Sequence, residues 1–345
     1  MKKVIVILAI IALVAFSGCV EQPETIEEGT TEDGATGHET TGEDVAITHL
    51  RIGYQPSTHQ IAHMIAMENG WWKSDLAEFG VTEVSDYQFA SGPPEMTAMM
   101  GGHLDIAYVG TAPPITAIAQ GLKAKIVAGV QTQGSDLVLR PEVNYTSPSD
   151  LIGLKIATFP SGSIQDTVFR KFLTDNDVAI EDVEIVPMGP ADAIAAISTD
   201  AVDCVFLPHP GPAVIELAGD GRSVVTSGEM WPGHACCCLV VSDELIENNP
   251  EMVKQIIRTH IRATAYLNEN QNESSQIFAD KIGYDIDVVK HSFETWDGEW
   301  ITDPHLELDD ALEYATVLYE LGYIEEPLTA EDLFDTSFYD EVSGE

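Results

Sequence analysis

The sequence predicts an α/β protein with two lobes, each a mostly parallel sheet flanked by helices. Strand-like apolar runs alternate with helical runs from residue 50, and the same alternation restarts near residue 149. Beyond residue 241 only helical patterns follow. This alternation is typical of parallel sheets covered by helices. The chain from residue 47 onward has about 300 residues, which is enough for two hydrophobic cores.

The first unit starts with a short strand and a helix. Ile61, Met64 and Ile65 have helical spacing, and Gly70 ends that helix. The loop 91–94 opens a second helix that runs to residue 100. Together the patterns predict strands at 50–54, 84–89, 104–109 and 125–130, and helices at 61–69, 94–100 and 115–120.

The second unit repeats this pattern and then gives way to helices. Its expected strands are 154–158, 183–186, 202–207 and 235–241, and its expected helices are 164–175, 191–199, 250–268, 273–282, 287–292 and 308–321. The last four helices have no sheet of their own to cover, so we expect them to pack on the first lobe. The predicted lobes are 47–138 with 235–330, and 139–234. The chain would cross between them near 134–140 and 230–234, and residues 331–345 would be a peripheral acidic tail.

The first 19 residues are typical of a lipoprotein export signal. Two lysines precede an apolar run, Val4 to Phe16, and Ser17 and Gly18 stand before Cys19. The run is too short for a membrane-spanning helix, which needs about 20 residues. Residues 20–46 are acidic, lack Lys and Arg, and have too little apolar surface to fold. We expect lipidation at Cys19, a disordered tether, and an extracytoplasmic location at the cell membrane.

Charge and motifs limit the function classes. The formal net charge is −41, and so acidic a surface repels nucleic acid. The sequence shows no nucleophile–base pair, phosphate loop or HExxH motif that would predict catalysis. We therefore expect a protein that is not an enzyme and that uses no cofactor.

Several segments resemble one known family. Residues 52–55, 68–72, 102–107 and 110–114 are similar to the first lobe of ABC-transporter solute-binding proteins of the nitrate, sulfonate, taurine and thiamine-pyrimidine type. Residues 150–157, with Ser161, Gly162 and Ser163 after them, are similar to the start of that family's second lobe. The resemblance implies a type II periplasmic-binding-protein fold, with two crossing strands and a ligand clamped between the lobes.

Four strand-to-helix loops are the expected binding elements, since ligands of open α/β sheets bind at the carboxyl ends of strands. Each loop combines Gly or Pro with a small hydroxyl or amide, although such residues also serve as helix caps. The predicted ligand-binding residues are Gln55, Ser57, Thr58, His59, Ser91, Gly92, Gly110, Thr111, Ala112, Ser135, Ser161, Gly162, Ser163, Met188, His209 and His234.

The four loops contain no Lys or Arg. A sulfonate or nitrate would therefore be held by backbone N–H groups, hydroxyls and histidine, as oriented dipoles can do. A neutral heterocycle also suits such loops, and Asp136 or Asp166 could meet the ammonium group of a zwitterion. Trp231 and Phe206 are the expected aromatic contacts.

Three consecutive cysteines, Cys236 to Cys238, lie in the predicted strand 235–241. Adjacent strand residues point to opposite faces, so these three alone cannot form one metal cage. Our interpretation is a run of buried small residues and no metal site. The related thiamine-pyrimidine synthases carry a cysteine run in a comparable region and use iron.

The resemblance implies a lipid-anchored solute-binding protein that captures a sulfonate, taurine or nitrate-like oxyanion. Its partners would be the small-molecule ligand and a membrane permease with its cytoplasmic ATPase. Two alternatives stay open: a thiamine-pyrimidine precursor binder or synthase-related enzyme that uses His and Cys with iron, and a ligand sensor on the same fold.

Overall fold

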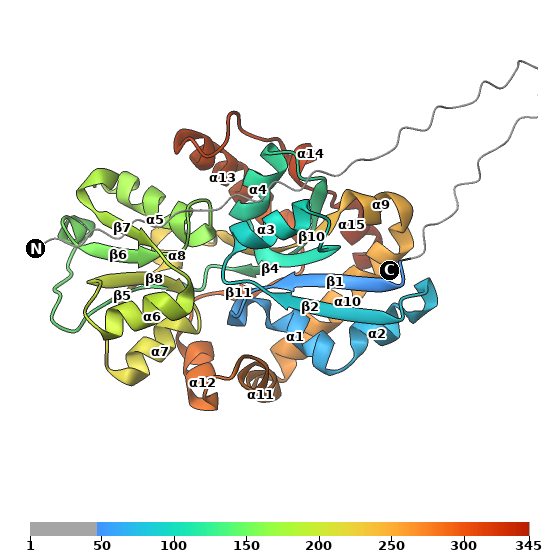
Figure 1. Ribbon diagram of the computed structural model, residues 1–345, viewed down its shortest axis with the longest axis horizontal. Helices are drawn as coiled ribbons and strands as arrows, with labels where there is room; N and C mark the ends of the chain where they lie inside the picture. Colours follow the sequence, from blue (N-terminus) through green and yellow to red (C-terminus); the bar gives the residue numbers. More distant parts are fainter. Residues whose placement is uncertain (1–46, 345) are drawn as a thin grey trace, which may run out of the picture. The chain divides into compact units, whose positions relative to one another are not determined.

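The computed structural model describes residues 47–344, so the predicted export signal, Cys19 and tether lie outside the described residues. Two mixed sheets organise the chain (Figure 1). The first has the strand order β11-β4-β10-β3-β1-β2, and the second has the order β7-β6-β8-β5-β9. This arrangement confirms the predicted two-lobe α/β fold.

The first lobe combines residues from both ends of the described chain. Its strands are β1 (His49–Tyr54), β2 (Glu83–Gln88), β3 (Ile106–Gly110), β4 (Ala124–Thr132), β10 (Ala235–Ser242) and β11 (Glu299–Trp300). Its helices before the first crossing are α1 (Ile61–Glu68), α2 (Trp71–Asp75), α3 (Gly92–Met100) and α4 (Ala112–Ala119). The C-terminal helices are α9 (Asp243–Asn248), α10 (Pro250–Glu269), α11 (Gln271–Ile282), α12 (Ile286–Thr295), α13 (Leu308–Glu320), α14 (Ala330–Leu333) and α15 (Ser337–Ser343).

The second lobe lies between the two crossings. Its strands are β5 (Ser135–Leu139), β6 (Lys155–Thr158), β7 (Glu184–Pro187), β8 (Cys204–Pro208) and β9 (Arg222–Thr226). Its helices are α5 (Ile164–Asp175), α6 (Pro190–Ser198), α7 (Gly211–Ala218) and α8 (Ser227–Met230). Strands β5 and β9 and helices α7 and α8 were not predicted as elements.

The sheets are less parallel than predicted. Strand β10 runs antiparallel to both of its neighbours, β3 and β4, and β5 runs antiparallel to β8 and β9. Both strands enter a lobe directly from the other lobe, without the crossover helix that parallel neighbours require. The order β2-β1-β3 and the order β7-β6-β8 keep the expected parallel pairing.

The first crossing is shorter and earlier than predicted. Because β5 belongs to the second sheet, the chain crosses at Gln133 and Gly134, before the boundary expected after residue 138. Both residues have positive φ, 55° and 82°. A Cβ at Gly134 would lie 2.8 Å from the His59 ring and 2.8 Å from Trp296, so a glycine is required there. The second crossing lies between α8 and β10, near Gly233.

The C-terminal helices pack on the first lobe, as predicted. Helix α10 packs against α1, and α13 packs against α4. The tail is not peripheral, however, since Leu333, Phe334 and Phe338 are buried and α15 packs against α10. These three apolar residues belong to the main hydrophobic core. Within residues 47–344, no helix has the length and apolar character needed to cross a bilayer.

Candidate functional site

The predicted loops meet at the interface between the lobes. The β1–α1 loop of the first lobe reaches the β8–α7 loop of the second, where the Ser57 hydroxyl and the Thr58 N–H both donate to the His209 carbonyl at 3.1 Å. Elsewhere on the interface, Lys171 of α5 forms an ion pair of 3.2 Å with Glu313 of α13. The two lobes are thus in direct contact through residues that are far apart in the sequence.

A cavity of about 210 Å³ opens between α3 and α4 of the first lobe and the start of α5 in the second. Its polar lining comes from hydroxyl and amide side chains, its apolar lining includes methionine and proline, and none of its described lining residues carries a charge. The lining residues are Pro93, Met96, Thr97, Met100, Pro113, Thr116, Ala117, Gln120, Ser161 and Gly162. Only Ser161 and Gly162 of this set were predicted.

The loop hydroxyls divide into helix caps and unpaired groups. The side chains of Ser57 and Ser163 accept capping hydrogen bonds from His59 N–H and Asp166 N–H. Ser91 and Thr111 stand at the same position before α3 and α4 but make no side-chain cap within the described chain. The Thr111 hydroxyl is buried without a hydrogen-bond partner of ordinary geometry among the described residues. Capping therefore does not explain Thr111, which lies outside the cavity lining. The Thr116 hydroxyl also has no partner among the described residues, and it does line the cavity, so it is free to bind a ligand there.

Glycines allow the lobes to approach each other. A Cβ at Gly110, at the end of β3, would lie 2.9 Å from Cγ1 of Ile164 in the opposite lobe. Ala112, two residues further along the chain, is buried. Gly92 lies against Pro113 within the first lobe, where an added Cβ would be 2.4 Å from the proline ring. Gly162 has a φ of 80° and faces the Thr116 hydroxyl.

Ser135, Met188 and His234, which were predicted to bind the ligand, have partners inside the protein instead. Ser135 accepts a hydrogen bond from Gln165 at 3.1 Å inside the second lobe. Met188 packs against that lobe's smaller apolar cluster. The His234 ring bonds to the Tyr314 hydroxyl at 2.8 Å, and burial lowers the pKa of His234 to about 4. These three side chains stabilise the two lobes and the second crossing.

Of the two predicted aromatic contacts, neither lines the cavity. Phe206 is fully buried and packs on Phe169 with ring centroids 5.9 Å apart, so it belongs to the core. Trp231 packs against Tyr314 at 4.7 Å. The sequence signal that suggested both was proximity to a crossing, which does not fix the direction of a side chain.

The two aspartates considered for an ammonium group have other partners. Asp166 accepts from Arg170 at 2.7 Å and from the Tyr323 hydroxyl at 2.9 Å. Asp136 is buried, and one of its oxygens lies 3.4 Å from the His209 ring. The other ring nitrogen of His209 lies 3.1 Å from the Ser292 hydroxyl of α12, so His209 links the second lobe to a helix of the C-terminal part.

Glu95 was missed by the sequence analysis. It lies on α3, is fully buried, and accepts a hydrogen bond from the side-chain amide of Gln55 at 2.8 Å. Burial raises the pKa of Glu95 well above its ordinary value, which favours the neutral acid. The hydrogen bond holds Gln55 inside the first lobe. Helical periodicity alone does not show that the Glu95 carboxyl group is buried.

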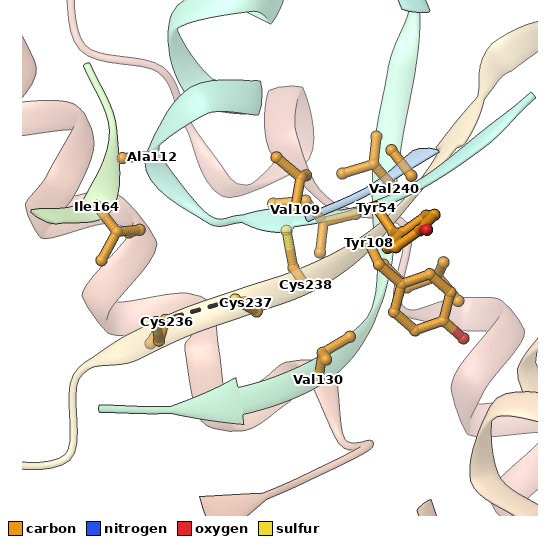
Figure 2. Packing of buried hydrophobic residues seen from close by; sticks show 14 of the residues in the cluster. Tyr54, Tyr108, Val109, Ala112, Val130, Ile164, Cys236, Cys237, Cys238 and Val240 are labelled. Atoms are coloured by element: carbon orange, nitrogen blue, oxygen red, sulfur yellow. Dashed lines mark hydrogen bonds between the residues drawn. The ribbon is translucent and has the colours of Figure 1, made fainter. Parts of the chain in front are cut away.

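The cysteine run has a geometry that strand alternation did not predict. Ala235 pairs with Thr132 and Cys237 pairs with Gln131, so Cys236 is an extra residue in a β-bulge. The bulge brings the Cys236 and Cys237 sulfurs to 3.9 Å from each other, as the dashed line in Figure 2 marks, whereas Cys238 points toward Val109. The loop residue His59 completes a group whose three ligand atoms lie within 4.8 Å of one another. His59 therefore lies beside two cysteines.

The two thiols differ in acidity. Burial raises the pKa of the Cys237 thiol, but its contacts with Cys236 and His59 outweigh burial and lower it to about 5. Burial and the neighbouring Cys237 raise the pKa of Cys236 well above its ordinary value.

Comparisons with known proteins give a consistent result. The sequence profile of the NMT1-like family matches residues 44–282. A putative aliphatic sulfonates-binding protein of Bacillus subtilis is 25% identical over 98% of this chain and 95% of its own length. The alkanesulfonate-binding protein SsuA of Xanthomonas axonopodis, solved with MOPS, superposes with a TM-score of 0.75 at 19% identity, over 84% of this chain and 98% of that one.

The periplasmic nitrate-binding protein NrtA of Synechocystis superposes with a TM-score of 0.74 at 17% identity, over 86% of this chain and 89% of that one. These similarities confirm the expected type II periplasmic-binding-protein fold. All three relatives are named as binding proteins.

Proposed function

The chain belongs to the NMT1-like family, and from this membership and its cleft we propose a lipid-anchored solute-binding protein of an ABC importer. It is a binding protein and not an enzyme, in line with its named relatives. In this proposal a small solute, such as a sulfonate, taurine or a nitrate-like oxyanion, is captured between the lobes and delivered to a membrane permease.

The observation that carries the proposal is the cavity of about 210 Å³ lined by both lobes. A solute that contacts α3 and α4 on one side and Ser161 and Gly162 on the other gains more contacts when the lobes are together. Ligand binding then favours the closed form through this difference in affinity. The permease would recognise that closed form.

The neutral lining determines how an anion would be held. Hydroxyls of Thr116 and Ser161, with backbone N–H groups, would replace a full countercharge. The same lining also supports a second candidate, a neutral thiamine-pyrimidine precursor, because a neutral ring does not need a cationic side chain. Capture of either solute uses the same cleft.

A thermal-shift screen tests the proposal. The panel contains taurine, alkanesulfonates, nitrate and pyrimidines, and hits are confirmed by calorimetry. At a concentration 100 times its Kd, a bound solute stabilises the protein by about 2.7 kcal/mol. If only pyrimidines stabilise the protein, the solute is a neutral thiamine-pyrimidine precursor and not an oxyanion. No stabilisation by any compound of either class would contradict the proposal.

Thr116→Val and Ser161→Ala are expected to weaken solute binding separately, since both hydroxyls line the cavity. Each change removes one neutral hydroxyl, and the loss of one hydrogen bond costs about 0.5–1.5 kcal/mol, or roughly 2- to 12-fold in Kd. Because the Thr116 hydroxyl has no hydrogen-bond partner among the described residues, Thr116→Val should not lower the melting temperature of the solute-free protein. Ser163→Ala is the control, since Ser163 caps α5 and its loss should lower the melting temperature instead. Unchanged affinity in both test variants would place the solute elsewhere.

Cys19→Ser is expected to release the protein from membranes and leave solute affinity intact. The short apolar run before Cys19 and the acidic stretch after it motivate this expectation. Membrane and soluble fractions of expressing cells are compared after a salt wash. A Ser variant that still sediments with membranes would show that another feature holds the protein there.

A further inference from the structure

We propose that His59, Cys236 and Cys237 form a binding site for one thiophilic divalent metal ion of the Zn²⁺ class. The site lies where the β1–α1 loop meets the bulge of β10, and all three residues are buried. The inference does not depend on the identity of the solute, because it concerns side chains outside the lining of the 210 Å³ cavity.

The three donor atoms already have the spacing of a tetrahedral site. Two sulfurs bound at about 2.3 Å to one tetrahedral Zn²⁺ lie about 3.8 Å apart, and a nitrogen bound at about 2.0–2.1 Å lies about 3.6 Å from each sulfur. Here the sulfurs are 3.9 Å apart, and Nδ1 of His59 lies 3.5 Å from Cys236 and 3.9 Å from Cys237. One ion can therefore contact all three atoms with little movement.

The histidine is held in the correct tautomer. Nε2 of His59 lies 2.6 Å from the Gly134 carbonyl, which can only accept a hydrogen bond. Nε2 must therefore carry the proton, and the lone pair of Nδ1 faces the two sulfurs. Metal-binding histidines commonly donate their second N–H to a backbone carbonyl in this way, which fixes the orientation of the ring.

The donor set selects the kind of ion. Two thiols and one imidazole favour borderline and soft ions over Mg²⁺ or Ca²⁺, which prefer oxygen ligands. Three protein donors leave the fourth tetrahedral position to water or another small ligand. A disulfide between the two cysteines is a poor alternative, since consecutive Cα atoms are about 3.8 Å apart and disulfides usually need about 4.4–6.8 Å.

Cobalt titration tests the site. The full-length chain carries Cys19→Ser, so that the remaining cysteines are the four described ones. We expect one equivalent of Co²⁺ to give a thiolate-to-cobalt charge-transfer band with intense tetrahedral d–d bands, and Zn²⁺ to remove both. Cys236→Ala and Cys237→Ala should each weaken binding by at least about 100-fold, the upper end of the effect of removing an outer-shell partner.

Cys238→Ala and Cys204→Ala are the matched controls. Both cysteines are buried, and neither belongs to the three-residue group, so both variants should keep the cobalt spectrum. Circular dichroism confirms that each variant is folded before titration. The proposal is overturned if folded wild-type protein gives no sulfur-to-cobalt band, or if Cys238→Ala lowers the affinity as much as Cys236→Ala does.

Discussion

Lowering the pH from 7 to 4.5 is expected to remove about 2 kcal/mol of folding free energy through His260 alone. This residue lies on α10 and is fully buried; Nε2 is 2.8 Å from the Gly129 carbonyl, and Nδ1 is 3.1 Å from the Tyr108 hydroxyl. The Gly129 carbonyl accepts from Nε2–H in either protonation state, whereas the Tyr108 hydroxyl can donate to Nδ1 only when the ring is neutral. Burial lowers the pKa of His260 to about 4.

The direction of the effect follows from proton binding. Between pH 6.5 and 4 the unfolded chain binds a proton at this histidine and the folded protein does not. Stability is therefore fully present above pH 6.5 and falls as the pH drops through that window. Glu95 and Glu307 act in the opposite sense, because burial raises the pKa of both carboxyl groups well above the ordinary value and their contribution is lost as the pH rises.

A variant of His260 separates the contribution of this histidine from those of Glu95 and Glu307. His260→Gln keeps a side chain that can donate and accept hydrogen bonds but does not titrate. Urea denaturation of both proteins at pH 4.5 and pH 7 should show a pH dependence that differs by about 2 kcal/mol. His103→Gln is the control, since His103 is exposed and its replacement should leave the difference unchanged. Equal pH dependence in wild type and His260→Gln would contradict the assignment.

The sequence was sufficient for the fold wherever one pattern repeats. Alternating strand and helix signals located most strands and helices of both lobes, and the absence of a second sheet near the end placed the last helices on the first lobe. Strand β5 was missed because its five residues are all buried, and so short an apolar run gives no periodicity that distinguishes a strand from a linker. The tail was misjudged because its acidic residues outnumber the few apolar ones that anchor it.

The site was less predictable than the fold. Loop composition pointed to two residues that line the cavity, Ser161 and Gly162. It did not separate capping hydroxyls from unpaired ones, because that difference depends on side-chain direction. Nor could it find the group around His59, which joins residues about 177 positions apart and depends on a bulge at Cys236. In a regular strand without the bulge, the sulfurs of Cys236 and Cys237 would point to opposite faces of the sheet.

Gly110→Ala is expected to weaken solute binding by roughly 5- to 150-fold while leaving each lobe folded. The added Cβ would lie 2.9 Å from Cγ1 of Ile164, an atom near the backbone of the opposite lobe that cannot simply swing away. Forcing an extra methyl group into a filled contact typically costs about 1–3 kcal/mol. Here the penalty applies only when the lobes are together, so it lowers the population of the closed form that binds the solute.

A double-mutant cycle with Ile164→Ala distinguishes this steric effect from general damage. Ile164→Ala removes the atom that the new Cβ would meet, so Gly110→Ala should cost much less affinity in that background than in the wild type. Gly189→Ala is the matched control across the same interface, because its added Cβ would lie at an ordinary 3.6 Å from Ala90. The measurement is Kd by calorimetry, with melting temperatures of the solute-free proteins. An equal loss of affinity in both backgrounds, or an equal loss in Gly189→Ala, would mean that contact between Gly110 and Ile164 does not limit closure.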